Sequence, residues 1–294
     1  MIEGIKRALP WWAKIAAKLV LARLPITKRT WQRLGLFSPG SMLDAAYAIE
    51  VFDSHFQRAR GLRPGFSYLE LGPGDSLATA IVARARGAEG GWLVDAGAYA
   101  SRSPEVYRAL IARLEGPETA ELLAPFSLCN SADELLNAAG CTYGEDGLES
   151  LKQIPDGSLD FIFSHATLEH IALGDFAATC RQFYRIQKPG GHGSHLIDFK
   201  DHLGGSLQSL RFSHGLWEAP WFARHSGFYT NRLRLSQMIK QFEDAGFTVE
   251  VVSRDCWPAP PLDPAKFDRA FAALSQHDIL TKGVLVRLGK NGGQ

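Results

Sequence analysis

Acidic residues stand beside a glycine turn in the stretch Phe66-Ser-Tyr-Leu-Glu-Leu-Gly-Pro-Gly-Asp75. We expect a buried strand over residues 67–71, a turn at Gly72-Pro73-Gly74 and a helix from Ser76 to about Arg86, because its apolar residues recur at helical spacing. Glycines let the backbone approach a ligand closely, and a helix N-terminus offers N–H groups and a positive dipole. Strand, turn and helix in this order predict a nucleotide-binding site.

The turn departs from the pattern of a dinucleotide site. Gly-x-Gly-x-x-Gly needs a third glycine where Leu77 stands, and Glu70 would repel a pyrophosphate. A second strand, expected over residues 91–95, ends in Asp95, whose carboxylate can accept hydrogen bonds from ribose hydroxyls. Glu70 and Asp95 together favour S-adenosylmethionine, whose reactive portion carries an amine. An α/β domain whose glycine turn serves another function stays open as an alternative.

Further strands and helices alternate along the chain. We expect a strand near residues 141–143, a strand ending at Ser164, a helix from about Asp175 to Gln187, a tight turn at 188–191 and a strand over 193–198. This order predicts an α/β, doubly wound, Rossmann-like sheet that is mostly parallel. Ligands of such sheets bind at the carboxyl ends of the strands. The polar residues expected at those ends are Glu70, Asp95, Asp146, Ser164 and Asp198.

Composition narrows the class of protein. The chain has 294 residues, 46% of them hydrophobic, which is enough for one large folded domain. A net charge of +1 argues against nucleic acid as a partner. The four cysteines form no C-x-x-C pair, so we expect no structural zinc, no disulfide framework and a cytoplasmic location.

Four motifs resemble those of the class I S-adenosylmethionine-dependent methyltransferases. They are Leu69-Glu-Leu-Gly-Pro-Gly-Asp-Ser76, the acid Asp95, Asp160-Phe-Ile-Phe-Ser-His-Ala-Thr-Leu-Glu-His170 and Lys188-Pro-Gly-Gly191. The resemblance covers roughly residues 60 to 290. The stretch from Asp201 to Arg232 is similar to a bacterial subgroup of these enzymes often found near polysaccharide or natural-product genes.

The resemblance implies a role for each matching residue. Glu70, Gly72 and Gly74 would lie under the methionine end of the cofactor, with Asp75 in the same turn. Asp95 would bind the ribose hydroxyls, Asp146 and Gly147 would flank adenine together with Glu145, and Ser164 and His165 would contact the methionine portion. It also implies a seven-stranded sheet whose last strand, expected over residues 283–288, runs antiparallel to the others.

A long insertion over residues 199–233 follows the fifth expected strand and is rich in aromatic and hydrogen-bonding residues. It stands where a lid over an acceptor would lie, although helical packing or dimerisation would explain it too. Methyl transfer needs an acceptor held in line with the leaving sulfur, and a base helps when the acceptor is a hydroxyl. The candidate bases are His165, His170, His195 and Asp198, of which we select His165 and His170. For each histidine a structural role stays open, and we expect no metal.

The first 34 residues are basic, and Trp11, Trp12 and a stripe of cations predict an amphipathic helix. Two interpretations stay open: a peripheral contact with the inner face of the membrane, or docking on the protein's own domain or on another copy. We therefore divide the chain into an N-terminal helical extension, 1–60, and a methyltransferase domain, 61–294. His55, near the end of the extension, is either a pocket residue or an ordinary partly buried histidine.

The sequence thus predicts O-methylation of a small molecule or a sugar or glycan by an S-adenosylmethionine-dependent methyltransferase. A cofactor-binding regulatory or assembly protein without turnover is one alternative, and an NAD(P)-dependent oxidoreductase is another. The sequence leaves the oligomeric state and the acceptor undetermined.

Overall fold

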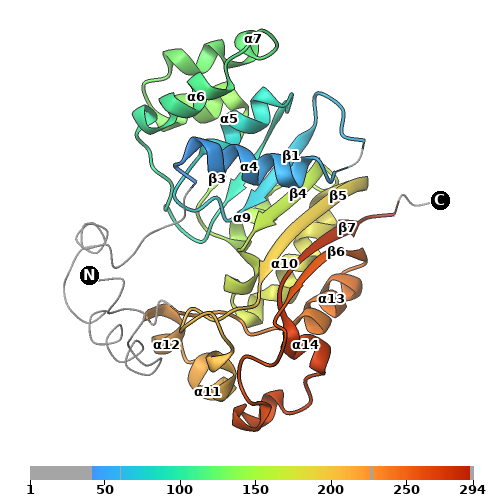
Figure 1. Cartoon of the computed structure of the whole chain (residues 1–294). Helices are drawn as coiled ribbons and strands as arrows, with labels where there is room; N and C mark the ends of the chain where they lie inside the picture. The colour runs from blue at the N-terminus through green and yellow to red at the C-terminus, as the bar shows by residue number, and fades with distance from the viewer. Residues whose placement is uncertain (1–41, 60, 226–227, 292–294) are drawn as a thin grey trace, which may run out of the picture.

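A computed structural model describes residues 42–291 except residues 60, 226 and 227 (Figure 1). Seven strands form one sheet in the order β3-β2-β1-β4-β5-β7-β6. All neighbouring pairs are parallel except those of β7, which runs antiparallel to β5 and β6. This confirms the expected seven-stranded, mostly parallel sheet with an antiparallel last strand. The strands are β1 Ser67–Leu71, β2 Gly90–Val94, β3 Cys141–Gly144, β4 Leu159–His165, β5 Gln187–Asp198, β6 Thr248–Cys256 and β7 Thr281–Gly289.

The tight turn expected at residues 188–191 was wrong, because β5 already begins at Gln187. Leu159 pairs with Gln187, but the next pair is Phe161 with His192, so residues 188–191 bulge from β5 opposite Asp160. Lys188 donates to the Asp160 carboxylate at 2.8 Å and secures the bulge. A bulge of this kind bends the strand locally without ending it.

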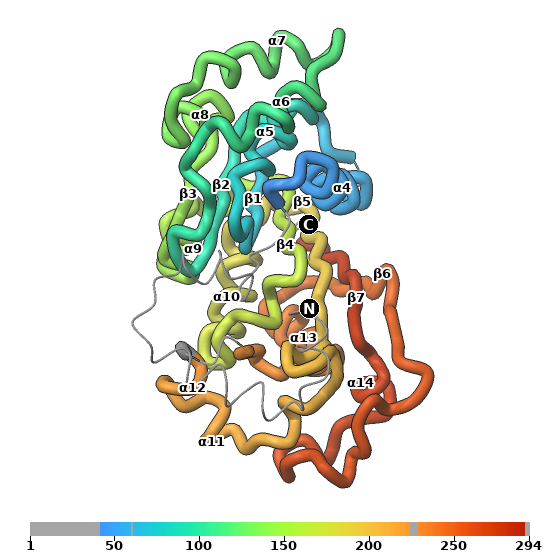
Figure 2. The backbone as a smooth tube through the Cα atoms, turned by 60° about the vertical axis from the view of Figure 1, so that its left-hand side comes forward, coloured from blue at the N-terminus to red at the C-terminus, as the bar shows by residue number. Residues whose placement is uncertain are grey.

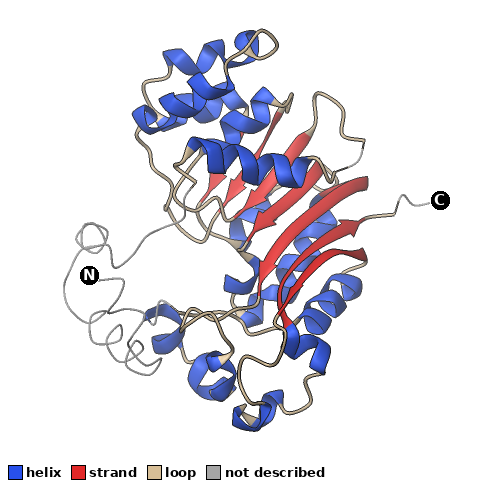
Figure 3. Ribbon diagram, in the orientation of Figure 1, coloured by secondary structure: helices blue, strands red, loops and turns tan. Residues whose placement is uncertain are grey.

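Helices cover both faces of the sheet (Figure 3). One face carries α4 Ala45–Phe56, α5 Ala78–Ala85, α6 Arg108–Leu114, α7 Ala120–Leu123 and α8 Ala132–Ala139. The other face carries α9 Leu148–Gln153, α10 Leu173–Ile186 and α13 Leu235–Asp244. Short 3₁₀ helices connect these elements at Pro104–Tyr107, Ala124–Leu128, Leu168–His170, Gln208–Arg211, Pro264–Lys266 and Arg269–Phe271.

The core forms because alternate residues of the central strands face opposite helical layers. Tyr68 and Phe163 pack toward α4, whereas Leu69 and Ile162 pack toward α10 and α13. Burying each such side chain contributes about 2 kcal/mol. Phe52 of α4 is fully buried, with its ring 5.7 Å from that of Phe163. The boundary expected at residue 60 therefore does not separate α4 from this core, while residues 1–34 lie outside the described part of the chain.

Two insertions gather at the carboxyl end of the sheet (Figures 1 and 2). The first, expected over residues 199–233, contains α11 His214–Trp217 and α12 Pro220–His225. The second lies between β6 and β7 and contains α14 Gln276–Leu280. Leu207 and Leu210 of the first form a small core with Phe271 and Ile279 of the second. The second insertion was not predicted from the sequence.

Candidate functional site

The glycine turn follows β1 in the chain and is hydrogen-bonded to the end of β2. Gly72 and Gly74 have φ angles of +80° and +67°, which side chains rarely adopt. A Cβ on Gly72 would lie 2.3 Å from the hydroxyl of Thr167, whereas a Cβ on Gly74 would meet nothing within 4 Å. The Gly74 N–H donates to Asp95 at 3.0 Å, and the Ala96 N–H donates to the other carboxylate oxygen at 2.7 Å. Each oxygen keeps a second lone pair, with which Asp95 can accept from a diol.

Glu70 lies in β1, directly before this turn. It is only 2% exposed, and its Oε2 has no hydrogen-bond partner among the described residues. Burial, opposed by Thr79 and assisted by the neighbouring Asp95, raises the pKa of Glu70 to about 8. A cationic ligand group against Glu70 would supply the missing partner and stabilise the carboxylate. The amine of S-adenosylmethionine fits this requirement.

The start of α5 differs from the sequence-based expectation of free N–H groups. The Leu77 N–H donates to the Tyr107 hydroxyl at 2.9 Å, and the Ala78 N–H donates to the Ser76 hydroxyl at 3.0 Å. These two donors are therefore already satisfied within the protein. These two N–H groups are not available to bind a pyrophosphate, as the N–H groups at a helix N-terminus do in dinucleotide sites.

The remaining cofactor candidates lie around the same strand ends. Asp75 is 7% exposed, burial raises its pKa, and its carbonyl accepts from Ser101 at 2.9 Å. Gly147 donates to the Asp95 carbonyl at 2.8 Å, which places the loop after β3 beside the loop after β2. Asp146 in that loop is exposed, whereas Glu145 is ion-paired with Arg102.

Ser164 and His165 end β4 but face opposite layers. The Ser164 hydroxyl is fully buried and lies 2.8 Å from Nδ1 of His195, so its side chain serves the core and not the predicted cofactor contact. The reason is strand alternation, which sends consecutive side chains to opposite faces. His165 faces the α4 layer, and its Nδ1 lies 3.2 Å from Nε2 of His55. Burial lowers the pKa of His165, an effect that Glu50 partly opposes.

His170 belongs to a different network from His165. Its ring stacks on that of His202 with centroids 5.0 Å apart, and its Nδ1 lies 3.1 Å from the Tyr229 carbonyl oxygen. Next to it, Glu169 is 3% exposed, and burial raises its pKa to about 8. Asn231 of the first insertion fixes this segment, donating to the carbonyls of Leu168, Glu169 and Ile171.

A cavity of about 310 Å³ opens beside His165, between the ends of β4, β5, β6 and β7. Its floor is apolar and includes Leu196 and Leu285. Two ion pairs line its sides: Lys200 with Asp198 at 3.2 Å, and Lys282 with Asp255 at 3.0 Å. The residues that line this cavity include His165, Leu196, Asp198, Lys200, Asp255, Lys282 and Leu285.

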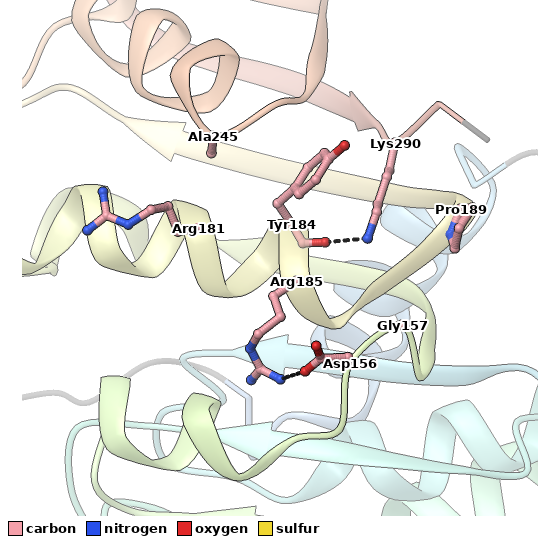
Figure 4. A pocket seen from close by; sticks show the side chains of 8 residues that line it. All are labelled: Asp156, Gly157, Arg181, Tyr184, Arg185, Pro189, Ala245 and Lys290. Carbon is pink, nitrogen blue, oxygen red and sulfur yellow. Dashed lines mark hydrogen bonds and ion pairs between the residues drawn. The ribbon is translucent and has the colours of Figure 1, made fainter. Parts of the chain in front are cut away.

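A second hollow, of about 600 Å³, lies away from these strand ends, beside α10 and the C-terminal Lys290 (Figure 4). Lys290 donates to the carbonyls of Tyr184 and Gln187 at 2.7 and 2.8 Å. Arg185 donates to Ile154 and Leu151 and pairs with Asp156. Both cations thus stabilise the fold, and we assign no ligand to this hollow.

The sequence analysis did not identify Tyr143 as a residue that shapes the site. The Tyr143 hydroxyl accepts from Tyr99 and Ala100 at 3.2 and 3.3 Å and donates to Gly97 at 3.1 Å, which fixes the loop after β2. Nothing in the local sequence signals this long-range role. Within the described residues, no group of three or more His, Cys, Asp or Glu side chains is arranged to hold a metal ion.

Residues 119–194 match the family model of a methyltransferase domain. No curated protein matches the chain. Among solved structures, the YcgJ protein of Bacillus subtilis is 16% identical, with 84% of this chain and 100% of that chain covered and a TM-score of 0.46. An S-adenosylmethionine-dependent methyltransferase of Mesorhizobium loti is 18% identical, with 83% and 99% covered and a TM-score of 0.44.

Residues 119–194 are therefore similar to a methyltransferase domain, and the sheet order with its antiparallel β7 belongs to a Rossmann-like fold. A methyltransferase domain implies an enzyme that takes S-adenosylmethionine as its cofactor.

Proposed function

We propose that the enzyme transfers a methyl group from S-adenosylmethionine to a hydroxyl of a small molecule or glycan. The observation that carries this proposal is the cavity of about 310 Å³ beside His165 at the end of β4, which we name the acceptor cavity. Its carboxylates accept and its ammonium groups donate hydrogen bonds, which suits hydroxyls because they do both. Its apolar floor suits the flat face of a sugar or aromatic ring.

Residues of the chain divide the work. We propose that Glu70 holds the cofactor's amine, Asp95 its ribose hydroxyls and Asp146 with Gly147 its adenine end. The bound cofactor supplies a methyl group activated by the positive sulfur. His165 accepts the proton that the acceptor hydroxyl loses as its oxygen bonds to the methyl carbon and the carbon–sulfur bond breaks. His170, whose Nε2 lies 3.3 Å from Nε2 of His202, is not among the residues that line the cavity.

The location of the protein is part of the same proposal. All four cysteines are free thiols, which suits the reducing cytoplasm. Within the described residues, no helix has the length and apolar character needed to cross a membrane. The membrane contact proposed for residues 1–34 falls outside the described part of the chain.

An oxidoreductase is disfavoured because the first N–H groups of α5 are bonded to Tyr107 and Ser76.

The test of the proposed methyl transfer is to measure the transfer of labelled methyl from S-adenosylmethionine to separate panels of hexoses, phenols and primary amines. We expect label on hydroxyl acceptors, and a loss of kcat of about 100-fold or more in His165→Gln. The exposed His277 gives the matched control, His277→Gln, which should retain full activity. Transfer to amines alone, or full activity of His165→Gln, would contradict the proposal.

A further inference from the structure

A buried histidine of α4 connects the proposed base to strand β5. His55 is 1% exposed, and its Nδ1 lies 2.8 Å from the Ser194 hydroxyl, while its Nε2 lies 3.2 Å from Nδ1 of His165. Its ring packs beside that of Phe163, with centroids 5.2 Å apart. Three elements far apart in the sequence therefore meet in one hydrogen-bonded row, Ser194–His55–His165.

The row links the protonation of the two rings. Burial and the neighbouring histidines lower the pKa of His55 well below its usual value, so its ring is neutral and has one donor and one acceptor. If His55 Nδ1–H donates to Ser194, its Nε2 must accept from Nδ1–H of His165. The remaining nitrogen of His165, Nε2, then carries a lone pair. The opposite polarity would leave Nε2 of His165 protonated and unable to accept a proton.

We propose that His55, held by Ser194, is a positioning residue that fixes His165 in the tautomer whose Nε2 accepts the acceptor's proton. The catalytic part of this inference rests on the proposed function, but the tautomer of His165 does not. A tautomer fixed by a buried partner is a known device for orienting an imidazole base. A histidine on α4 thus contributes to a site that otherwise lies at the strand ends.

Other charged groups face the row and bear on any pH profile. Glu50 approaches from α4, Arg58 from the turn after α4, and His195 from β5. The ion pairs Asp198–Lys200 and Asp255–Lys282 line the cavity beside His165. These groups are the same in every His55 or Ser194 variant, so differences among those variants report on the row.

The test is a two-bond ¹H–¹⁵N correlation spectrum of the full chain with ¹⁵N-labelled histidine, in the presence of S-adenosylhomocysteine. The His165 signals are assigned by their loss in His165→Gln. We expect Nδ1 of His165 to be protonated and Nε2 to be free of a proton in the native chain. Protonation of His165 at Nε2 in the native chain would overturn the inference without the need for any variant.

Two near-isosteric variants provide the matched pair. The amide of His55→Gln reaches the place of Nε2 and can accept from His165, whereas the shorter His55→Asn reaches only the place of Nδ1. We expect His55→Gln to keep the tautomer and His55→Asn to give a mixture. Once a hydroxyl acceptor is identified, we expect kcat of His55→Asn to be about tenfold below that of His55→Gln. A mixture of tautomers removes only part of the rate increase that a general base provides. The KM for S-adenosylmethionine should not change.

Ser194→Ala covers the case in which a His55 variant fails to fold, and it should also give mixed tautomers of His165. Equal spectra for native, His55→Asn and Ser194→Ala proteins would contradict the inference. Full activity of His165→Gln would instead defeat the proposed base and leave the tautomer result standing. The two failures are therefore distinguishable.

Discussion

The two glycines after β1 have the same backbone class but different surroundings. Gly72 touches the Thr167 side chain, which comes from the loop after β4, whereas Gly74 faces open space beside Asp95. Gly72 thus packs two strand ends together, and Gly74 leaves room above the turn. Sequence alone predicted both as cofactor-binding glycines, because the contact with Thr167 depends on β1 and β4 being neighbours.

Replacing each glycine by alanine separates these roles. Alanine at a positive φ costs about 1–2 kcal/mol, so Gly74→Ala should lower the free energy of unfolding by about that amount. Gly72→Ala adds a clash with Thr167 and should cost at least about 3 kcal/mol. Chemical denaturation of both variants measures the difference. Equal losses would show that Thr167 moves aside freely.

Glu70 gives the stability a defined pH dependence. Its pKa of about 8 in the folded protein exceeds the ordinary value of 4.5, so the folded chain keeps a proton that the unfolded chain has lost. The contribution of Glu70 to the free energy of unfolding is fully present below pH 4.5 and is lost as the pH rises through about 8. In this range its contribution falls by up to about 1.4 kcal/mol per pH unit.

Glu70→Gln should remove this dependence and be more stable than the native protein at pH 8, with little difference at pH 4.5. Urea unfolding at both pH values measures it. A native protein whose stability relative to Glu70→Gln is the same at the two pH values would contradict the raised pKa. If the amine of S-adenosylmethionine faces Glu70, the cofactor should raise the free energy of unfolding at pH 8 more for the native protein than for Glu70→Gln.

At the scale of elements, the two insertions are joined by Arg232. Its side chain is fully buried, and its guanidinium lies 5.0 Å from the ring of Trp217 in the first insertion and 4.9 Å from that of Phe271 in the second. It donates to the Phe212 carbonyl at 2.6 Å and lies 3.6 Å from Glu218. Burial lowers the pKa of Arg232 to about 10, but the side chain remains charged at pH 7.

Arg232→Met should cost about 3 kcal/mol in the insertions, because it removes a buried cation and leaves its carbonyl partners unpaired. Hydrogen exchange should become faster in residues 199–234 and 257–280, while exchange in β1 and β4 stays the same. Arg254→Met on the exposed face of β6 serves as the matched control. Faster exchange throughout the sheet would show that the insertions are not a separate unit.

Elements with a local sequence signal were predicted, whereas features that depend on contacts between distant residues were missed. The strand over residues 67–71 was predicted because its apolar run and the glycine turn that ends it are local signals, and β1 has these bounds. The second insertion was missed because Leu262, Phe271 and Ile279 pack against Leu207 and Leu210 of the first insertion, a contact that the local sequence does not signal. The strand start at Gln187 was missed because a bulge is defined by the register of two strands.

The same limit applies to the site. Glu70 and Asp95 stand next to recognisable strand ends, so the sequence placed them at one edge of the sheet. Ser164 was assigned to the cofactor because its position at a strand end was visible, while the face to which it points was not. The contact of His55 with His165 joins residues 110 positions apart, and only the fold brings them together.

At the scale of the whole molecule, we propose that the sheet has a cofactor half and an acceptor half. The ends of β1, β2 and β3 carry the proposed cofactor residues, and the ends of β4, β5 and β6 with the start of β7 border the acceptor cavity. His165 lies at the end of β4, between the two halves. This arrangement is what transfer between a fixed donor and a variable acceptor requires.

Calorimetric titration of the purified chain with S-adenosylmethionine, and separately with NAD, tests the central claim most directly. The account predicts that S-adenosylmethionine binds in the micromolar range and NAD does not, and that Asp95→Ala abolishes binding while Asp146→Ala weakens it. Binding of NAD instead of S-adenosylmethionine, or full binding by Asp95→Ala, would contradict the placement of the cofactor at the ends of β1 and β2.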